Sequence, residues 1–171
     1  REHKLRLYPA LTWAVTTAVN RHREFRMAYD TQGQLGYYDQ VHPEYTVLDP
    51  VTHNMDSLNT AYNTSFPAFY QAMTKDLDRF HQEGIRTGSR ENSILLSCVP
   101  WFSYTDVSFH PNSSLMFLRP MFVWGKYQET GTSASLPFTI QVHHAAADGY
   151  HCHLLLEDLT DLLEHPYQNL L

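Results

Sequence analysis

The stretch Phe138-Thr-Ile-Gln-Val-His-His-Ala-Ala-Ala-Asp-Gly149 decides the interpretation of this chain. Its first residues read as a strand, Gly149 interrupts the pattern, and apolar residues then recur at helical spacing over residues 150–163. The two adjacent histidines, His143 and His144, therefore fall where a strand gives way to a loop. Such a junction exposes side chains on a rigid support, which is typical of catalytic positions.

His144 is the stronger candidate for chemistry. A neutral imidazole changes charge near neutral pH and can remove a proton from a hydroxyl. Asp148 follows four positions later and is expected to brace the loop by hydrogen bonds or a salt bridge. The ordinary alternative is a hydrogen-bonded histidine without catalytic function, and the combined motif favours catalysis. His143 is expected on the opposite face of the strand, as a packed or structural histidine.

This stretch, together with residues 150 and 151, resembles the active-site signature of chloramphenicol acetyltransferases. Further landmarks of that family follow in the same order: Tyr8-Pro-Ala10, Glu24-Phe-Arg-Met-Ala28, Val41-His-Pro-Glu-Tyr-Thr-Val47, Ser97-Cys-Val-Pro-Trp101 and Gly125-Lys-Tyr127. The resemblance covers almost the whole chain. It implies an α+β fold, a two-layer sandwich with a mixed, mainly antiparallel sheet packed by helices.

The resemblance also implies an activity, the transfer of acetyl from acetyl-CoA to a hydroxyl of chloramphenicol, which inactivates the antibiotic. His144 corresponds to the general base, Ser97 to the oxyanion donor and Asp148 to the third catalytic position. The attack is direct, without an acyl-enzyme, and the sequence has no Gly-x-Ser-x-Gly nucleophile motif. From the residues alone, a serine such as Ser97 more commonly bonds to neighbouring backbone.

Further site positions are implied by the same resemblance. The positions that match cofactor contacts are Arg6, Tyr8, Trp101, Lys126 and Tyr127, which could otherwise be core or surface residues. The positions that match acceptor contacts are Thr46, Met55, Phe109 and Val123, of which the last three depart from the usual residues, so that a related hydroxylated acceptor stays possible. The family implies a homotrimer with sites between subunits, and a chain that lacks the family's N-terminal segment, including an arginine that pairs with the aspartate.

Composition sets further limits. The chain has 171 residues with 43% hydrophobic and 18% charged residues, which suits a single globular domain over 1–171. A formal charge of −6 argues against a nucleic-acid partner, and no apolar stretch is long enough to span a membrane. Two cysteines suit a reducing compartment such as the cytoplasm. No histidine spacing matches a familiar zinc site, so no metal is expected.

The patterns predict helices over 7–20, from residue 64 or 65 to Gly84, and over 150–163, the last with Cys152, Leu155, Leu156, Leu159 and Leu163 inward. Short strands over 25–29, 35–38 and 45–48 are expected to form a meander, and residues 49–64 to be irregular. Strands over 94–99, 115–127 and 136–143 follow, the last two as an antiparallel hairpin.

Two other functions fit these patterns. The acyltransferase domain of 2-oxoacid dehydrogenase complexes and peptide-synthetase condensation domains have a similar His-x-x-x-Asp-Gly. The former would predict a lipoyl module or its linker, and the latter a far longer chain. An inactive remnant that binds an apolar ligand is the third possibility.

Overall fold

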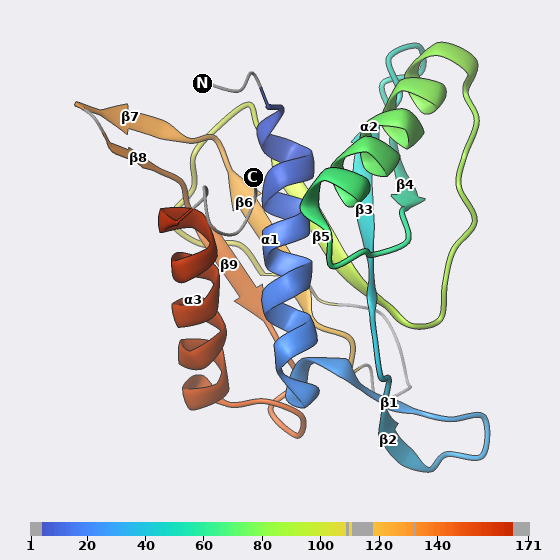
Figure 1. Cartoon of the computed structure of the whole chain (residues 1–171), viewed down its shortest axis with the longest axis vertical. Coiled ribbons are helices and arrows are strands. Elements are labelled where there is room, and N and C mark those ends of the chain that lie inside the picture. The colour runs from blue at the N-terminus through green and yellow to red at the C-terminus, as the bar shows by residue number, and fades with distance from the viewer. Residues whose placement is uncertain (1–4, 109, 111–117, 132, 166–171) are drawn as a thin grey trace.

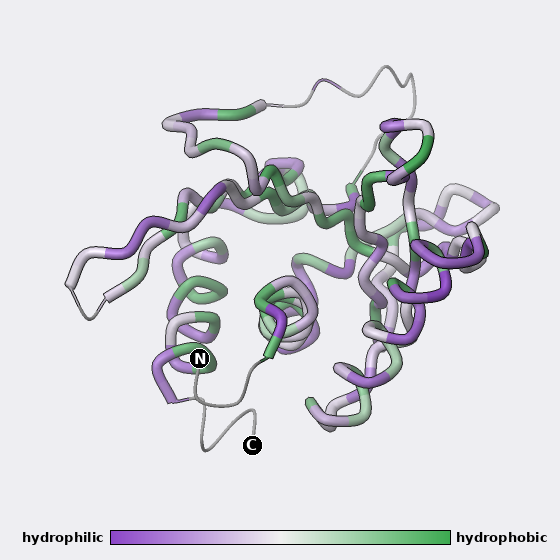
Figure 2. The backbone as a smooth tube through the Cα atoms, turned by 90° about the horizontal axis from the view of Figure 1, so that it is seen from above, coloured by the Kyte–Doolittle hydropathy of each residue, from purple (hydrophilic) through white to green (hydrophobic). Residues whose placement is uncertain are grey.

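In the computed structural model, residues 5–108, 110, 118–131 and 133–165 are described. Within them, three α-helices pack against one face of a five-stranded sheet. The helices are α1 (Leu7–Arg21), α2 (Phe66–Glu83) and α3 (Gly149–Glu164). Figures 1 and 2 show them in one layer beside the sheet, with α1 in the middle. This arrangement confirms the predicted two-layer α+β fold.

The main sheet is mixed. Its strand order is β4 (Met55–Asn59), β3 (His42–Leu48), β5 (Ser93–Val99), β6 (Met121–Gly125) and β9 (Phe138–Gln141). β3, β5 and β6 run parallel to one another, and the edge strands β4 and β9 run antiparallel to their neighbours. The parallel strands therefore all end at one end of the sheet, and β9 runs toward the other end.

Alternation along the strands separates an apolar face from a more polar one. Tyr45, Leu96, Phe122 and Trp124 point to the helices and are almost completely buried. The helices contribute matching apolar stripes, such as Phe69, Met73 and Leu77 on α2. Burial of such side chains stabilises the fold by roughly 1.5–3 kcal/mol each relative to exposure. The core thus lies between the helices and one face of the sheet.

Helix boundaries follow local chemistry. Pro67 lies in the first turn of α2, where its missing N–H costs nothing, and Gly84 ends the helix with a positive φ of 68°. Asp148 caps α3. In α3 the buried residues are Leu155, Leu159 and Leu162, whereas Leu156 and Leu163 are exposed, so two of the predicted inward positions were wrong.

Two other predictions were wrong. The expected meander does not form, because β1 (Met27–Tyr29) pairs only with β2 (Leu35–Tyr37), while β3 belongs to the main sheet. A 3-10 turn, η1 (Arg23–Arg26), precedes β1. Residues 49–64 are not wholly irregular, since they contain β4. The predicted hairpin is confirmed by the β6–β9 pairing, and β7 (Gln128–Thr130) and β8 (Ser133–Ser135) extend it as a separate ribbon.

Candidate active site

His144 lies in a turn between β9 and α3, and its side chain is exposed. The carbonyl of His143 closes the turn by accepting hydrogen bonds from the amides of Ala146 (2.8 Å) and Ala147 (3.1 Å). Ring Nδ1 of His143 also accepts from the amide of Ala145 at 3.1 Å. His143 therefore has a structural part in this turn, although its ring is exposed rather than packed.

Asp148 braces the other end of the turn. Its carboxylate accepts hydrogen bonds from the amides of Tyr150 (2.9 Å) and His151 (3.3 Å), and its Oδ1 lies 2.8 Å from Nδ1 of His151. The backbone N–H of His151 is the largest contribution to a lowered pKa of Asp148. Among the described residues, no hydrogen bond or ion pair joins Asp148 to His144. Asp148 thus acts on the turn through the start of α3.

Ser97 belongs to a row of side chains that crosses all the strands on the face away from the helices. Its Oγ is 3.0 Å from Oγ1 of Thr46, and it lies opposite Val123 on β6. Ser57 on β4 and Thr139 on β9 continue the row at its two ends. Thr46, Ser97 and Val123, predicted from the sequence as site residues, are therefore brought together.

Ser97 and His144 are far apart within one chain. Ser97 is level with Thr139, and His144 comes five residues later, beyond the opposite end of the sheet. At ~3.3 Å per strand residue and ~4.8 Å between strands, this separates the two by more than about 10 Å. Figure 1 shows the β9–α3 turn at the end of the sheet away from the β7–β8 ribbon. One copy of the chain therefore does not bring the imidazole of His144 to the hydroxyl of Ser97.

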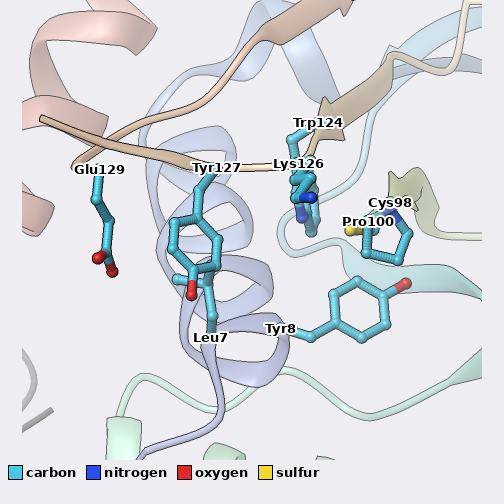
Figure 3. Close-up of a pocket in the computed structure, with 9 residues that line it drawn as sticks. Leu7, Tyr8, Cys98, Pro100, Trp124, Lys126, Tyr127 and Glu129 are labelled. Atoms are coloured by element: carbon cyan, nitrogen blue, oxygen red, sulfur yellow. The ribbon is translucent and has the colours of Figure 1, made fainter. Parts of the chain in front are cut away.

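A cleft of about 510 Å³ opens at the C-terminal ends of β5 and β6, on the helix side. Figure 3 shows side chains from the start of α1, the end of β5 and the segment leading into β7 around it. The lining residues are Leu7, Tyr8, Cys98, Pro100, Trp124, Gly125, Lys126, Tyr127 and Glu129. The surface is thus largely aromatic and apolar, with one cation and one carboxylate.

Tyr8 forms the floor of this cleft. Its hydroxyl donates a 2.6 Å hydrogen bond to the carbonyl of Thr46, and its ring packs edge-on against Trp124 at 5.7 Å. Burial raises the pKa of Tyr8, so the phenol stays neutral. Burial also raises the pKa of the Cys98 thiol to about 11, so the thiol is protonated at neutral pH. The cleft is therefore built for binding rather than for nucleophilic attack by its own groups.

Three of the five predicted cofactor positions, Tyr8, Lys126 and Tyr127, line the cleft, and the other two do not. The guanidinium of Arg6 is 2.8 Å from the carboxylate of Asp78 on α2, and Trp101 is more than half exposed just beyond β5. Sequence reasoning did not include Trp124 or Cys98 among the site residues. A signal existed for both, because Trp124 directly precedes the Gly125-Lys-Tyr127 motif and Cys98 lies within Ser97-Cys-Val-Pro-Trp101.

The acceptor positions are divided. Thr46 and Val123 lie beside Ser97, as described above. Met55 starts β4 and is half exposed; it lies opposite Leu48, two residues along from the Thr46–Ser57 pair and on the same face of the sheet. Phe109 lies outside the described residues. The structure therefore places three of the four predicted positions on the face that carries the hydroxyl row.

The sequence profile of the family described as "Chloramphenicol acetyltransferase" matches residues 1–160. The chain belongs to the chloramphenicol acetyltransferase family. One relative, the chloramphenicol acetyltransferase of Clostridium perfringens, is 36% identical over 162 residues, which are 92% of this chain and 74% of that protein. Another, from Campylobacter coli, is 37% identical over 161 residues, 92% of this chain and 78% of that one. These matches confirm the resemblance seen in the sequence and the class of enzyme.

Solved structures confirm the fold. A structure named chloramphenicol acetyltransferase superposes with a TM-score of 0.80 at 21% identity, over 92% of this chain and 78% of that one. The Azotobacter vinelandii dihydrolipoamide acetyltransferase superposes with a TM-score of 0.68 at 17% identity, over 98% and 72%. The rival acyltransferase class thus shares the architecture, but at that identity the likeness shows the fold alone. Membership of the chloramphenicol acetyltransferase family rests on the sequence matches.

Two features are absent from the described residues. No helix among them combines the length and apolar character that crossing a membrane requires. In the same part of the chain, no three His, Cys, Asp or Glu side chains are grouped as metal ligands. The expectations about metal and cellular location stay predictions.

Proposed function

We propose that this protein transfers the acetyl group of acetyl-CoA to a hydroxyl of chloramphenicol, and so inactivates the antibiotic. Membership of the chloramphenicol acetyltransferase family is the observation that carries the proposal. The exposed His144 and the Thr46–Ser97 pair provide the groups that acyl transfer requires. A hydroxyl nucleophile needs a base, and the oxyanion that forms on attack needs a hydrogen-bond donor.

In the proposed mechanism, neutral His144 takes the proton of the acceptor hydroxyl as its oxygen attacks the acetyl carbonyl. The carbonyl becomes a tetrahedral oxyanion, to which the Ser97 hydroxyl donates a hydrogen bond. The carbon–sulfur bond then breaks, and protonated His144 gives its proton to the departing thiolate. Free CoA and the acetyl ester result. The high pKa of Cys98 suits this direct route, because the thiol that lines the cleft does not compete as a nucleophile.

The separation of His144 from Ser97 leads us to place each active site between two copies of the chain. The exposed turn of one copy would bring its imidazole to the hydroxyl row of a neighbour. A closed, symmetric assembly gives every copy the same role, and a homotrimer is the assembly that we propose. Asp148 would fix the turn rather than touch the reacting atoms.

The cleft is the proposed place for the nucleotide end of acetyl-CoA. Tyr8, Trp124 and Tyr127 offer aromatic faces for an adenine, and Lys126 offers a cation for a phosphate. Ser97 and Cys98 are neighbours on β5 whose side chains leave opposite faces of the sheet. The thioester would therefore have to pass the C-terminal edge of the sheet, near Gly125, to reach Ser97.

The acceptor would lie against the hydroxyl row, with Thr46 and Val123 as its contacts. Val123 is 1% exposed and offers an apolar surface beside two hydroxyls. We also place Met55 and Phe109 in the acceptor site. Because three of these four positions depart from the residues usual in the family, another hydroxylated acceptor is the second candidate.

The test is release of free thiol from acetyl-CoA, with and without chloramphenicol, by the protein and by His144→Ala. Loss of a general base is expected to lower kcat by roughly 10²- to 10⁴-fold. The matched control is His153→Ala, another exposed histidine, which pairs only loosely with Glu157 at 3.6 Å. Drug-dependent release that survives in His144→Ala would refute the role of the imidazole. Release with other alcohols but not with chloramphenicol would select the second candidate.

A further inference from the structure

A second cavity, of about 630 Å³, lies at the edge of the main sheet that β4 forms. Its walls are the end of β4, the face of α2 that carries Asp76 and Arg79, and residues 85–90 of the segment that joins α2 to β5. Figure 1 shows this segment running along the outer side of β4, on the opposite side of the molecule from α3. Within the described part of the chain, the cavity shares no lining residue with the cleft that contains Lys126. It is therefore a separate candidate site.

Asn59, the last residue of β4, is 5% exposed and forms part of the cavity wall. Its backbone amide donates to Oγ1 of Thr87 at 2.6 Å, and its side-chain Oδ1 accepts from Nε of Arg90 at 2.8 Å. The second bond fixes the orientation of the side-chain amide, because only its oxygen can face Arg90. The nitrogen Nδ2 is buried and, among the described residues, has no hydrogen-bond acceptor. A buried donor without an acceptor costs free energy, so a ligand atom that accepts from it is expected.

The next residue of this wall, Thr60, already has its partners. Thr60 is 2% exposed, and its hydroxyl donates to Oδ2 of Asp76 at 2.7 Å. The hydroxyl of Tyr45 lies 2.8 Å from the same Oγ1 and therefore donates to it. Both hydroxyl protons and one carboxylate oxygen are used in this chain of bonds. The side-chain amide of Asn59 is thus the group on the strand side of the cavity that a ligand can complete.

Three arginines also line the cavity, namely Arg79, Arg86 and Arg90. Arg86 pairs with the carboxylate of Asp56. In the described structure, Arg90 uses only its Nε, in the bond to β4, and Arg79 is exposed on α2 and forms no ion pair. Counted with Asp76 in the cavity wall, the two carboxylates leave an excess of one positive charge. The cavity is therefore locally cationic in a chain whose formal charge is −6.

We propose that this cavity binds an oxyanion, the phosphate or carboxylate group of a small molecule. The guanidinium groups of Arg79 and Arg90 present planar sets of donors that suit such oxygens, and their hydrogen bonds to an anion are charge-assisted. Nδ2 of Asn59 supplies a further donor from the strand side. The side chain of Ile85 gives the cavity an apolar surface for the body of the ligand. The inference goes beyond the proposed function and does not depend on it.

The experiment is isothermal titration calorimetry of the full chain with inorganic phosphate and, separately, with acetate. Ionic strength is held constant with sodium chloride, so that general screening of surface charge does not change during the titration. We expect a Kd on the order of 1 mM for the ion whose shape fits, which is within reach of a ligand with so few atoms. Tighter binding of one ion would identify the head group. Heat of binding from neither ion would overturn the proposal.

Two variants test the position of the ion. Asn59→Asp keeps an oxygen for Arg90 but replaces the free donor by a negatively charged acceptor, and should weaken binding at least about tenfold. Arg79→Gln changes only an exposed helical position and should weaken binding about tenfold, because a charge-assisted bond is lost. Lys75→Gln, one turn earlier on α2 and outside the cavity lining, is the matched control and should leave the Kd unchanged. An equal loss in the control, or no loss in the two test variants, would refute the site.

A second measurement reports on the cavity directly. The NMR signals of the side-chain NH₂ group of Asn59 should shift as the ion is added, and the shift should saturate with the calorimetric Kd. Lys126→Gln removes the cation of the other cleft and should not alter this shift. If Lys126→Gln abolishes the heat of binding while the signals of Asn59 do not move in the unaltered protein, the ion occupies the other cleft and the proposal is wrong.

Discussion

The two ends of the main sheet are built in different ways. At the C-terminal ends of β5 and β6, the cleft is formed by residues far apart in sequence, and aromatic packing holds it, with Trp124 stacked on Phe138 at 6.3 Å. At the other end, the His144 turn is closed by hydrogen bonds between residues two to four apart. At the first end Trp124 and Gly125 are buried while Tyr127 at the rim is exposed, and at the second end His144 is exposed.

The difference matches two tasks. A surface that binds a large ligand needs a shape that many side chains fix together, and core packing supplies this. A base that meets its substrate on a neighbouring copy has to project from the surface, and a short hydrogen-bonded turn supplies this. Under the proposed function the same fold would separate binding from proton transfer, and a complete site would require the two ends to come from different copies.

The strongest test of this separation mixes two inactive variants. Ser97→Ala alone should lower kcat roughly a hundredfold or more, as loss of an oxyanion donor does. Subunits of Ser97→Ala and His144→Ala, unfolded together and refolded as a mixture, should form sites that pair an intact Ser97 with an intact His144. In a random assembly about a quarter of the sites would do so, and activity should return to that level.

The control is refolding of each variant by itself, which should restore nothing. If the mixture stays as inactive as the separate variants, both residues act from the same chain, and the proposal that the two ends of the sheet belong to different copies is wrong. A monomeric mass in light scattering would point in the same direction. A recovered activity that scales with the mixing ratio would place His144 and Ser97 on different copies.

A smaller effect is expected from Gly125→Ala, which perturbs only the cleft end. A Cβ there would lie 2.7 Å from Cγ of Pro137 and 3.0 Å from the ring of Tyr104, whose hydroxyl is itself fixed to the carbonyl of Val123 at 2.7 Å. Such overpacking should lower the free energy of unfolding by about 1–3 kcal/mol. It should also raise KM for acetyl-CoA, because Gly125 lines the cleft.

Urea unfolding and steady-state kinetics measure these two effects. Gly36→Ala in β2 is the matched control, because a Cβ there meets no atom within 4 Å. Hydrogen-exchange protection of the Ala145 amide should not change in Gly125→Ala. A loss of protection in that turn would show that the two ends of the sheet are coupled.

Most elements of the fold could be predicted because their signals are local. α2 has Pro67 in its first turn and Gly84 at its end, and an apolar face between them. The predicted meander was wrong because strand pairing depends on contacts between distant segments, which the alternation of apolar and polar residues does not encode. β3, for example, pairs with β5, about fifty residues later. β4 was missed because Met55-Asp-Ser-Leu-Asn59 is polar, and only its pairing with β3 makes it a strand.

The same difference between local and long-range contacts applies to the candidate site. His144, its turn and Asp148 lie within one continuous stretch, and the sequence alone indicated a loop there that Asp148 braces, although not that Asp148 caps α3. The resemblance to a family led to Ser97, but its contact with Thr46 joins strands 51 positions apart. Arg6 was predicted to contact the cofactor, but its guanidinium pairs with Asp78 of α2. Sequence spacing does not place that helix beside Arg6.

The smallest effect concerns the turn end and appears as a pH dependence of stability. The pKa of Asp148 is lowered in the folded protein, chiefly by the backbone N–H of His151. Its contribution is therefore fully present above the unfolded pKa near ~3.9, and is lost as the pH falls through the lower folded value. Asp148→Asn keeps a capping oxygen but no charge.

At neutral pH, Asp148→Asn should unfold at a slightly lower urea concentration than the unaltered protein, because the start of α3 favours a negative charge. The gap should close below about pH 4, where the carboxylate is protonated. A gap that does not depend on pH would mean that the charge of Asp148 contributes nothing, and that the cap acts through geometry alone. The turn end would then be held in the way the cleft end is, by fixed contacts.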